Sequence, residues 1–469
     1  MKLKRAEISQ EDIDRQKAIM ERLRAHNAGS GAAPRAFIDT YGCQQNESDS
    51  EKLRGMLGRM GYSFTDKEAD ADVIVINTCA VREHAEMRVY GNVGALVHTK
   101  RNKPGQIIAL CGCMVQQPSV ADKIRRSFRH VDLVFGPQAL WRFPEYLERI
   151  LTERGRIFSI EDDPGTIAEG LPVVRDGTVK AWLSIMYGCN NFCSYCIVPY
   201  VRGRERSRAP ELILSEAKEL IAAGYKDITL LGQNVNSYGK DLESPIDFSE
   251  LLRRLNALDG EFLLRFMTSH PKDAGERLFK TLAQCEKVAH HLHLPFQAGN
   301  DRVLRAMNRG YTRTQYLELV DMARQYIPDI VLTSDVIVGF PGETEEEFND
   351  TLAVIEKARF DALFTFIYSK REGTPACRLD DPEPKDAKQR RFDALLKLQN
   401  SISEEKHREY VGKTLRVLVD GESGDLRYPL TARTNGGRLV RLSGNAAPGA
   451  FGNARITDCN TWALFGELI

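Results

Sequence analysis

The sequence predicts an α/β protein with three parts: a parallel α/β sheet domain, a partial (βα)6 barrel and a small antiparallel β-barrel. Two observations predict the first two parts, because short apolar runs alternate with helical patterns over residues 35–165 and again over residues 178–377. Such alternation is typical of a parallel sheet covered by helices. A third observation predicts the last part. Beyond residue 411 the chain changes to short, alternating strand-like runs separated by glycine turns, which is typical of a small β-barrel.

We expect four regions along the chain, with bounds at 1–34, 35–165, 175–405 and 408–469. Residues 1–34 are polar and end in a stretch rich in Gly, Ala, Ser and Pro, so they are predicted to be a solvated N-terminal extension that contains some helix. A charged helical connector is expected over residues 378–410, before the last part.

In the first α/β part, three apolar runs are expected to be strands and three amphipathic patterns to be helices. The strands are predicted at residues 36–41, 72–77 and 106–111, and the helices at 47–60, 81–99 and 120–128. This βαβαβα order predicts a small parallel sheet.

The second α/β part contains six further apolar runs separated by helical patterns. The strands are predicted at 181–186, 227–231, 263–268, 290–294, 330–338 and 362–368. The helices are predicted at 209–223, 248–258, 274–285, 301–326 and 344–358. In barrels and open sheets of this kind, chemistry takes place at the carboxyl ends of the strands.

Composition limits the classes of function. The 469 residues carry 28% charged side chains that balance to a net charge of zero, so a nucleic-acid contact must come from local basic patches. No apolar run is long enough for a membrane span, and the first residues do not resemble a secretory signal, so we expect a cytoplasmic protein with no membrane partner. In a reducing compartment the ten cysteines favour metal binding or catalysis over a disulfide framework.

A C-x3-C-x2-C triplet follows the first strand of the second α/β part, at Cys189, Cys193 and Cys196. Three thiolates on one loop fill three ligand positions of a four-iron cluster and leave one iron open to a ligand that is not protein. A zinc site would need a fourth cysteine or histidine nearby, and a redox pair of cysteines would leave Cys189 without a role. A catalytic iron–sulfur cluster is therefore the favoured interpretation.

A second set of cysteines follows the strands of the first part, at Cys43, Cys79, and Cys111 or Cys113. In a parallel sheet these strand ends share one edge, which predicts a second metal site. Buried structural cysteines are the alternative, because free cysteine is among the most buried residue types, but the repeated placement argues against it. The spacing does not choose between Cys111 and Cys113, because residues two apart on an extended segment point the same way.

Polar residues near the strand ends of the second part are candidate cofactor contacts. They are Gln233, Asn234, Ser269, Gln297 and Asp335, together with Tyr195 inside the cysteine loop. The candidate RNA contacts are Arg202, Arg204, Arg206 and Arg208 after the cysteine loop, and Arg416 and Arg433 in the last part. Each of these residues alone is also compatible with a helix cap, an ion pair or a solvated face.

The segment around the triplet, Met186-Tyr-Gly-Cys-Asn-Asn-Phe-Cys-Ser-Tyr-Cys, resembles the radical S-adenosylmethionine superfamily, in which such a triplet binds a 4Fe–4S cluster. Three further segments resemble the amino-terminal domain of the methylthiotransferases: Thr40-Tyr-Gly-Cys-Gln-Gln-Asn, Asn77-Thr-Cys-Ala-Val-Arg-Glu and Cys111-Gly-Cys-Met. The last part is similar to the TRAM domain, an RNA-binding module. The resemblance covers residues 35–469, and its pattern selects Cys113 as the third ligand of the second site.

Within this family, Tyr41-Gly-Cys-Gln-Gln-Asn and His293-Leu-Pro-Phe-Gln-Ala-Gly-Asn resemble the MiaB-type branch, which acts on isopentenylated adenosine in tRNA. The chain departs from the family pattern at Cys377, where alanine is expected. We expect Cys377, like Cys285 and Cys459, to be a packed small residue. The alternatives within the family are the branches that modify a ribosomal-protein aspartate or threonylcarbamoyladenosine in tRNA.

The resemblance implies a reaction that uses two 4Fe–4S clusters and S-adenosylmethionine. One S-adenosylmethionine would give its methyl group to sulfur on an auxiliary cluster held by Cys43, Cys79 and Cys113. A second would be cleaved at the triplet's cluster, and the resulting radical would abstract hydrogen from carbon 2 of N(6)-isopentenyladenosine at position 37 of tRNA. The implied partners are a tRNA anticodon stem-loop and an electron donor such as flavodoxin or ferredoxin. A non-enzymatic RNA-binding iron–sulfur protein is the alternative from another class of function.

Overall fold

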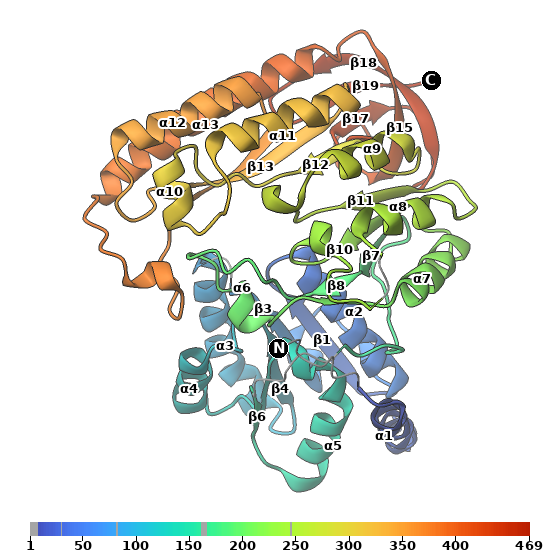
Figure 1. The fold of residues 1–469 in the computed structure, drawn as a ribbon. Coiled ribbons are helices and arrows are strands. Elements are labelled where there is room, and N and C mark those ends of the chain that lie inside the picture. Colours follow the sequence, from blue (N-terminus) through green and yellow to red (C-terminus); the bar gives the residue numbers. More distant parts are fainter. Residues whose placement is uncertain (1–7, 30, 81–82, 161–166, 244–245) are drawn as a thin grey trace. The chain divides into compact units, whose positions relative to one another are not determined.

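The structure is a computed structural model, which describes residues 8–29, 31–80, 83–160, 167–243 and 246–469 (Figure 1). The chain divides into two compact units. Unit 1 comprises the residues up to 176 together with 187–190 and 196–206, and unit 2 comprises 177–186, 191–195 and 207–469. Each unit has hydrophobic cores of its own.

Unit 1 is built on a six-stranded parallel sheet in the order β2-β1-β3-β4-β5-β6. Its strands are β1 (Arg35–Thr40), β2 (Ser63–Phe64), β3 (Val73–Thr78), β4 (Ile107–Gly112), β5 (Leu133–Phe135) and β6 (Ile157–Ser159). The predicted parallel sheet is confirmed, and its three predicted strands correspond to β1, β3 and β4. The additional strands are only two or three residues long, which is too short for a recognisable periodic pattern.

Helices cover both faces of this sheet (Figure 1). The helices of one face are α1 (Gln10–Ala28), α2 (Gln44–Arg59) and α5 (Phe143–Glu153), and those of the other face are α3 (Glu83–Asn102) and α4 (Pro118–Ser127). Alternate residues of β3 enter the two cores, with Val75 in the first and Ile76 in the second, because successive side chains of a strand point to opposite faces. A strand buried on both faces has an almost continuous apolar sequence, which is why β3 was recognisable.

Helix α1 corrects the prediction of a solvated N-terminal extension. It buries Ile19 and Met20 in a core of unit 1, and Arg22 pairs with Glu148 of α5 at 2.9 Å. The predicted helical content is present, but the helix is part of the folded unit. Its apolar residues form a narrow stripe among many charged side chains, so the polar composition concealed the packing face.

Unit 2 contains the six strands predicted for the partial barrel. They are β7 (Lys180–Ser184), β10 (Asp227–Leu231), β11 (Leu263–Phe266), β12 (His291–His293), β13 (Val331–Val338) and β14 (Ala362–Ile367). They form two parallel sheets, β7-β10-β11 and β12-β13-β14. A parallel bridge between Leu264 and Val288 continues the first sheet toward the second. This sequential order of six parallel strands confirms the predicted partial (βα)6 barrel.

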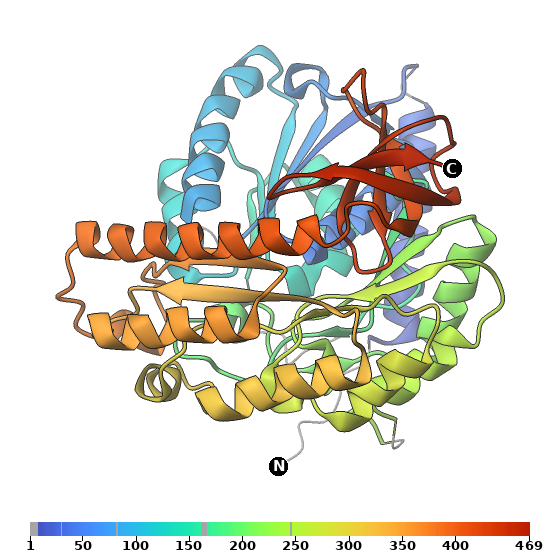
Figure 2. The ribbon, with the colours of Figure 1, turned by 90° about the horizontal axis from the view of Figure 1, so that it is seen from above.

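Helices flank these strands (Figure 2). They are α7 (Pro210–Ala222), α8 (Phe248–Asn256), α9 (Glu276–Gln284), α10 (Asp301–Ala306), α11 (Arg313–Tyr326) and α12 (Glu345–Ala358). The single helix predicted over 301–326 is wrong. The chain breaks between α10 and α11, where Asn308 and Gly310 have φ angles of 58° and 71°, which a helix does not accept.

The C-terminal segment of unit 2 is a closed barrel in the order β15-β16-β17-β19-β18, which confirms the predicted small β-barrel. Its strands are β15 (Thr414–Glu422), β16 (Leu430–Thr434), β17 (Leu439–Ser443), β18 (Phe451–Cys459) and β19 (Leu464–Leu468). All strand pairs are antiparallel except β17 with β19. The charged connector is α13 (Lys385–Arg408). Asp361 pairs with Arg438 of the barrel and with Lys406 of α13, and these buried pairs fix the barrel to the α/β part of unit 2.

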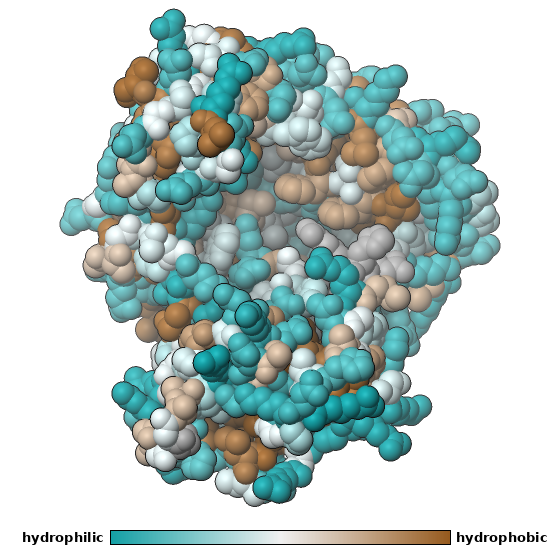
Figure 3. Space-filling model, turned by 180° about the vertical axis from the view of Figure 1, so that it is seen from behind, coloured by the Kyte–Doolittle hydropathy of each residue, from teal (hydrophilic) through white to brown (hydrophobic). Residues whose placement is uncertain are grey.

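Three short elements lie around the cysteine triplet: β8 (Met186–Tyr187), α6 (Val198–Val201) and β9 (Arg206–Ser207). Strands β8 and β9 form a two-stranded sheet. Within the described ranges, no helix is both long and apolar enough to cross a membrane. On the face shown in Figure 3, hydrophobic residues lie scattered between hydrophilic ones.

Candidate metal centres

Three cysteines lie at one edge of the unit 1 sheet. Cys43 follows β1 and is the N-cap of α2, Cys79 follows β3, and Cys113 follows β4. Because β1, β3 and β4 are neighbours in the sheet, their carboxyl ends bring the three cysteines to a common edge.

Two glycines allow the cysteine loops to approach one another. Gly42 has a φ of +118°, and a Cβ atom there would lie 2.5 Å from Cys79 Cβ and 2.8 Å from Cys79 Sγ. Gly112 has a φ of +95°, and a Cβ atom there would lie 2.4 Å from both Asn77 Oδ1 and Thr78 O. A side chain at either position would push the loops apart, so the close approach requires glycine.

The turn at Gly112 separates the two cysteines that their spacing could not distinguish. Cys111 ends β4 inside a core of unit 1, with 1% of its surface exposed. Cys113 lies beyond the turn, where the thiols of Cys43 and Cys79 both act on it electrostatically. This placement favours Cys113 as the third member of the predicted set, which stays a prediction, whereas Cys111 packs as a small core residue.

Asn46 holds the loops around this cysteine set together by hydrogen bonds. Its Nδ2 donates to Tyr41 O at 2.7 Å and to Thr78 O at 2.9 Å, which joins the loops after β1 and β3. Asn77 Nδ2 donates in turn to Asn46 O at 2.8 Å. Because Asn46 is fully buried, these bonds satisfy polar groups that would otherwise be costly, and they hold the loops without using the thiols.

Arg202 brings a buried positive charge to the same place. Only 5% of its surface is exposed, and its Nε donates to Cys113 Sγ at 3.0 Å. Its two terminal nitrogens donate to Asp49 Oδ2 and to Asn46 Oδ1, each at 2.7 Å. Burial lowers the pKa of Arg202, but Asp49 and the cysteine thiols outweigh this effect, so the pKa is raised and the guanidinium stays charged.

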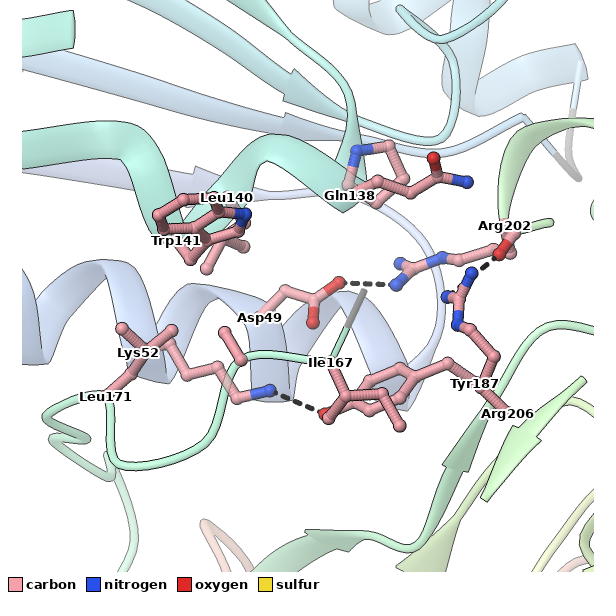
Figure 4. Close-up of a pocket in the computed structure, with 12 residues that line it drawn as sticks. Asp49, Lys52, Gln138, Leu140, Trp141, Ile167, Leu171, Tyr187, Arg202 and Arg206 are labelled. Atoms are coloured by element: carbon pink, nitrogen blue, oxygen red, sulfur yellow. Dashed lines mark hydrogen bonds and ion pairs between the residues drawn. The ribbon is translucent and has the colours of Figure 1, made fainter. Parts of the chain in front are cut away.

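A small cavity of about 50 Å³ lies beside the Asp49–Arg202 pair within unit 1 (Figure 4). Lys52 and Tyr187 line it and are joined by a hydrogen bond of 3.0 Å from Lys52 Nζ to the Tyr187 hydroxyl. Trp141 also lines it; its buried indole nitrogen has no hydrogen-bond partner among the described residues. The pair that contacts the cysteine set is thus bordered by a small, partly polar cavity.

The donor atoms of this set, three cysteine thiols, are of the type that an iron–sulfur cluster takes. Burial raises the pKa of Cys113 to about 12, with Arg202 opposing the rise and Cys43 and Cys79 adding to it, so the thiolates need a positively charged partner. Within the described part of the chain, no three His, Cys, Asp or Glu side chains are arranged to hold one metal ion. A 4Fe–4S cluster makes a different demand, because each of its irons takes a separate thiolate.

The C-x3-C-x2-C loop supplies the second set of thiols. Cys189 and Cys193 are buried and Cys196 is half-buried. Cys189 N donates to Gly203 O at 3.1 Å. Gly188 has a φ of +77°, and a Cβ atom there would lie 2.0 Å from Arg204 O, so glycine is required where the loop meets the chain that follows it.

In unit 2, the middle of this loop is held by the last residue of α10 and the segment that follows it. Ser194 Oγ donates to Ala306 O at 2.8 Å, and Asn308 Nδ2 donates to Phe192 O at 2.9 Å. Arg309 is 4% exposed, and its guanidinium donates to Cys193 Sγ at 3.3 Å. The same side chain donates to Pro295 O at 2.6 Å and to the Tyr311 hydroxyl at 2.9 Å.

The sequence did not identify Arg309 as a partner of the cysteine loop, and it interpreted Arg202 as an RNA contact. Both arginines lie far along the chain from the cysteines they contact, 116 residues for Arg309 and 89 for Arg202. The one local signal was the basic run that contains Arg202, and that run is equally typical of a phosphate-binding surface.

The predicted cofactor contacts all belong to unit 2. The Tyr195 hydroxyl lies 3.4 Å from Arg309 Nη1, and Asn234 Nδ2 donates to Asp273 Oδ2 at 2.8 Å. Asn234 Oδ1 is buried and has no partner among the described residues, which leaves an acceptor for a ligand. Gln233 lies just after β10.

The other three predicted contacts lie on or near β11, β12 and β13. Ser269 donates from its hydroxyl to His293 O, so that hydroxyl is engaged within the protein. Gln297 has a φ of 69°, and its N donates to Asp335 O at 2.9 Å. Asp335 Oδ1 lies 3.5 Å from His293 Nε2. A role of all six residues in cofactor binding stays a prediction.

The predicted RNA contacts differ in exposure. Arg202, Arg206 and Arg208 are buried, whereas Arg204 is exposed. In the barrel, Arg416 is exposed and pairs with Glu261, and Arg433 pairs with Asp420 at 2.9 Å. The contacts of Arg202 direct its charge to the cysteine set, and among the four arginines after the loop Arg204 is the one that is exposed.

Comparison with known proteins identifies three family models along the chain. The radical SAM superfamily matches residues 183–355, the uncharacterized protein family UPF0004 matches residues 35–136, and the TRAM domain matches residues 408–469.

The chain is also similar along nearly its whole length to curated proteins named tRNA-2-methylthio-N(6)-dimethylallyladenosine synthase. The protein of Alkaliphilus oremlandii is 51% identical, with 98% of each chain covered. The protein of Acetivibrio thermocellus is 48% identical, with 98% of this chain and 97% of that one covered.

Among solved structures, the chain resembles the radical S-adenosylmethionine methyltransferase TsrM from Kitasatospora setae with cobalamin and a [4Fe-4S] cluster bound. The TM-score is 0.54 at 14% identity, with 74% of this chain and 77% of that chain covered. A second structure of that enzyme, with tryptophan and a SAM analogue bound, gives a TM-score of 0.53 at 14% identity over 84% of this chain and 79% of that one. At this identity the likeness concerns the fold alone.

Proposed function

The chain belongs to the tRNA-2-methylthio-N(6)-dimethylallyladenosine synthase family, and from this we propose that it is a radical S-adenosylmethionine enzyme that inserts a methylthio group at carbon 2 of N(6)-isopentenyladenosine at position 37 of tRNA. One observation carries the proposal. The chain has two separate sets of three cysteines: one is the C-x3-C-x2-C loop, and the other is gathered at the edge of the unit 1 sheet.

The two cysteine sets have different tasks in this proposal. Cys189, Cys193 and Cys196 would hold the cluster that binds S-adenosylmethionine, and Cys43, Cys79 and Cys113 would hold the auxiliary cluster. When bound, the first cluster with S-adenosylmethionine would supply a carbon-centred radical, which is required because the C–H bond at carbon 2 has no acidic proton. The auxiliary cluster would supply a sulfur-bound methyl group. The protein's part is to hold the thiolates, exclude water and present the base.

The substrate adenine must leave its stack to be modified, which costs a few kcal/mol. Strand β14 of unit 2 offers aromatic side chains for it: Phe364 and Phe366 are 47% and 40% exposed, although both are large and apolar. The Phe364 ring packs edge-on against His293, with centroids 5.6 Å apart. Stacking on exposed aromatic rings is how proteins hold unstacked bases, and it also suits an isopentenyl substituent.

A phosphate backbone would be held by exposed cations. Arg204 in unit 1 and Arg416 in the barrel are exposed, and the family model for the barrel is the TRAM domain. Because the net charge of the chain is zero, these local charges must provide the electrostatic part of tRNA binding.

We infer that the target is the anticodon stem-loop and that a flavodoxin or ferredoxin is the electron donor. A tRNA substrate implies a cytoplasmic protein.

The proposal is tested by mass spectrometry of tRNA nucleosides. Cells that lack the gene are expected to lose 2-methylthio-N(6)-isopentenyladenosine and to retain N(6)-isopentenyladenosine. Purified protein with reconstituted clusters and a reductant is expected to form 5′-deoxyadenosine and the methylthiolated tRNA. With Cys193→Ala both products should disappear, whereas Cys113→Ala should retain 5′-deoxyadenosine and lose the methylthio product.

Each alternative predicts another outcome. A branch that acts on a ribosomal protein would leave tRNA unchanged and alter the mass of an aspartate-containing peptide. The threonylcarbamoyladenosine branch would alter a different nucleoside at the same position. A non-enzymatic RNA-binding iron–sulfur protein would form no 5′-deoxyadenosine, and Cys193→Ala would leave its function intact.

A further inference from the structure

We propose that Arg202 is a positioning residue for the auxiliary cysteine site, and that it makes the assembly and reduction potential of that site depend on the segment that follows Cys196. The inference rests on the proposed function in one respect, namely that Cys43, Cys79 and Cys113 hold an iron–sulfur cluster. It adds a protein residue outside the thiols that determines how this cluster is held.

The first step concerns the contacts of the guanidinium. Its three nitrogens donate to three different acceptors: Nε to Cys113 Sγ at 3.0 Å, one terminal nitrogen to Asp49 Oδ2 at 2.7 Å and the other to Asn46 Oδ1 at 2.7 Å. These three hydrogen bonds fix the plane of the guanidinium. They also fix the direction from which its Nε–H group points at Cys113 Sγ. A planar fork with several donors can do this, whereas the single ammonium group of lysine cannot.

The second step concerns charge. Asp49 and Arg202 form a buried pair, with side chains 7% and 6% exposed, and Figure 4 shows the Arg202 guanidinium directed at the Asp49 carboxylate. One full positive charge is thus fixed beside Cys113 in a place with little water. The pair is oriented so that the cation, and not the carboxylate, contacts the sulfur.

The third step concerns the segment to which Arg202 belongs. Ile197 and Val201 pack with Ala80 and Cys113 in one small hydrophobic cluster, and Arg202 N donates to Val198 O at 2.8 Å to end α6. Ile197, Val201 and Arg202, all within six residues after Cys196, therefore lie against Cys113. Because Cys196 belongs to the other cysteine set, one continuous segment serves both sets.

The consequence concerns the cluster that the three cysteines would hold. Reduction adds negative charge to a cluster, and a hydrogen-bond donor or a nearby cation stabilises that charge, which raises the reduction potential. Partners that orient a metal ligand also increase metal affinity, and their loss typically costs about 10- to 100-fold. Removal of Arg202 should therefore weaken iron retention and lower the reduction potential of the auxiliary cluster.

The experiment isolates the auxiliary cluster in the full-length protein. In a parent variant that carries Cys189→Ala, Cys193→Ala and Cys196→Ala, iron after reconstitution belongs to the other cysteine set. Arg202→Met in this parent is expected to lose its iron to a chelator about 10- to 100-fold faster and to show a lower midpoint potential in a redox titration followed by electron paramagnetic resonance. Arg202→Lys keeps the charge and should show a smaller fall in potential but a similar loss of retention.

The control is Arg204→Met, which removes an exposed guanidinium two residues away and should change neither quantity. Since Arg202→Met leaves the Asp49 carboxylate buried without its cation, folding is followed by circular dichroism. If that variant does not fold, iron retention and midpoint potential are measured in Arg202→Lys and in the double variant Arg202→Met with Asp49→Asn, and these two variants test the inference. Iron retention and potential equal to those of the parent in the folded variants would overturn the inference. A parent that binds no iron at all would instead contradict the proposed function.

Discussion

Arg309 Nη1 donates a hydrogen bond to Cys193 Sγ over 3.3 Å. Arg202 makes the same kind of contact with Cys113. Each cysteine set therefore includes one thiol that is contacted by a buried guanidinium, and in both cases that guanidinium is anchored by other acceptors. Three thiolates gather negative charge in a small volume, and a fixed cation beside one of them offsets part of it.

The first prediction concerns Arg309. Arg309→Met removes the donor to Cys193 and the bonds that hold the loop against Pro295 O and the Tyr311 hydroxyl. We expect 5′-deoxyadenosine formation to fall about 10- to 100-fold, because the loop that carries Cys193 loses its support. The rate is measured by chromatography after reconstitution and reduction. Arg305→Met, an exposed arginine on α10, is the control, and equal rates in the two variants would contradict the prediction.

The second prediction concerns Gly42. Gly42→Ala would place a methyl group 2.5 Å from Cys79 Cβ in a backbone conformation that L-residues avoid. We expect loss of the auxiliary cluster alone, so that about four of eight irons are retained per chain, while cleavage of S-adenosylmethionine continues. Gly58→Ala in α2 is the matched control, because a Cβ atom there meets nothing within 4 Å. Full iron content in Gly42→Ala would show that the loops are not held as closely as described.

The positions of the cysteines could be predicted from the sequence because the information is local. Cys79 and Cys113 follow β3 and β4, which are buried on both faces, and such strands are visible as continuous apolar runs. The break between α10 and α11 also had a local signal in Gly310 and in the capping residue Thr312, which the long apolar pattern concealed.

The partners of the thiols could not be predicted in this way. An arginine in a basic run has the same local sequence whether it faces phosphate or a buried thiol, and only the fold brings Arg202 to Cys113. The same holds for helix α1, whose apolar stripe is recognisable only when the surface it covers is known. The fold class and the cysteine sets thus follow from sequence, whereas the electrostatics of the sites needs the structure.

The third prediction concerns the pH dependence of stability. Burial lowers the pKa of His291 to about 3, with His293 and Arg265 adding to the effect, so the folded protein keeps this imidazole neutral. The unfolded chain takes up the proton near pH 6.5, and stability is therefore lost as the pH falls below that value. By pH 5 the loss amounts to at most ~2 kcal/mol. Burial also lowers the pKa of His270, to about 2, which acts in the same direction.

The variant His291→Gln isolates this contribution. Burial raises the pKa of Glu343 to about 7, so Glu343 adds stability as the pH falls from about 7 toward its unfolded value and opposes the histidines. This contribution is common to both proteins and cancels in their difference. Urea unfolding at pH 7.5 and pH 5 should show a larger loss for the wild type than for His291→Gln, and equal losses would contradict the prediction.

The fourth prediction concerns the attachment of the barrel in unit 2. Arg438→Met leaves Asp361 with Lys406 as a remaining cation at 3.1 Å, although the Asp361 side chain is only 3% exposed. Breaking a buried pair costs about 3–5 kcal/mol, so a marked fall in thermal stability is expected by calorimetry. Arg416→Met breaks an exposed pair with Glu261 and should cost less than about 1 kcal/mol. Similar costs for the two variants would argue against a buried junction.

The fifth prediction separates the arginines after the cysteine loop. Arg204 is exposed, so Arg204→Met should weaken tRNA binding and reduce the slope of log K against log salt by about one, with iron content unchanged. Arg254→Met, which removes an exposed arginine paired with Glu250 on α8, is the control and should bind tRNA as the wild type does. Binding is measured by filter retention over a range of salt concentrations. An unchanged salt slope in Arg204→Met would mean that the phosphate contacts lie elsewhere, and the barrel arginines, Arg416 first, would then be the next to test.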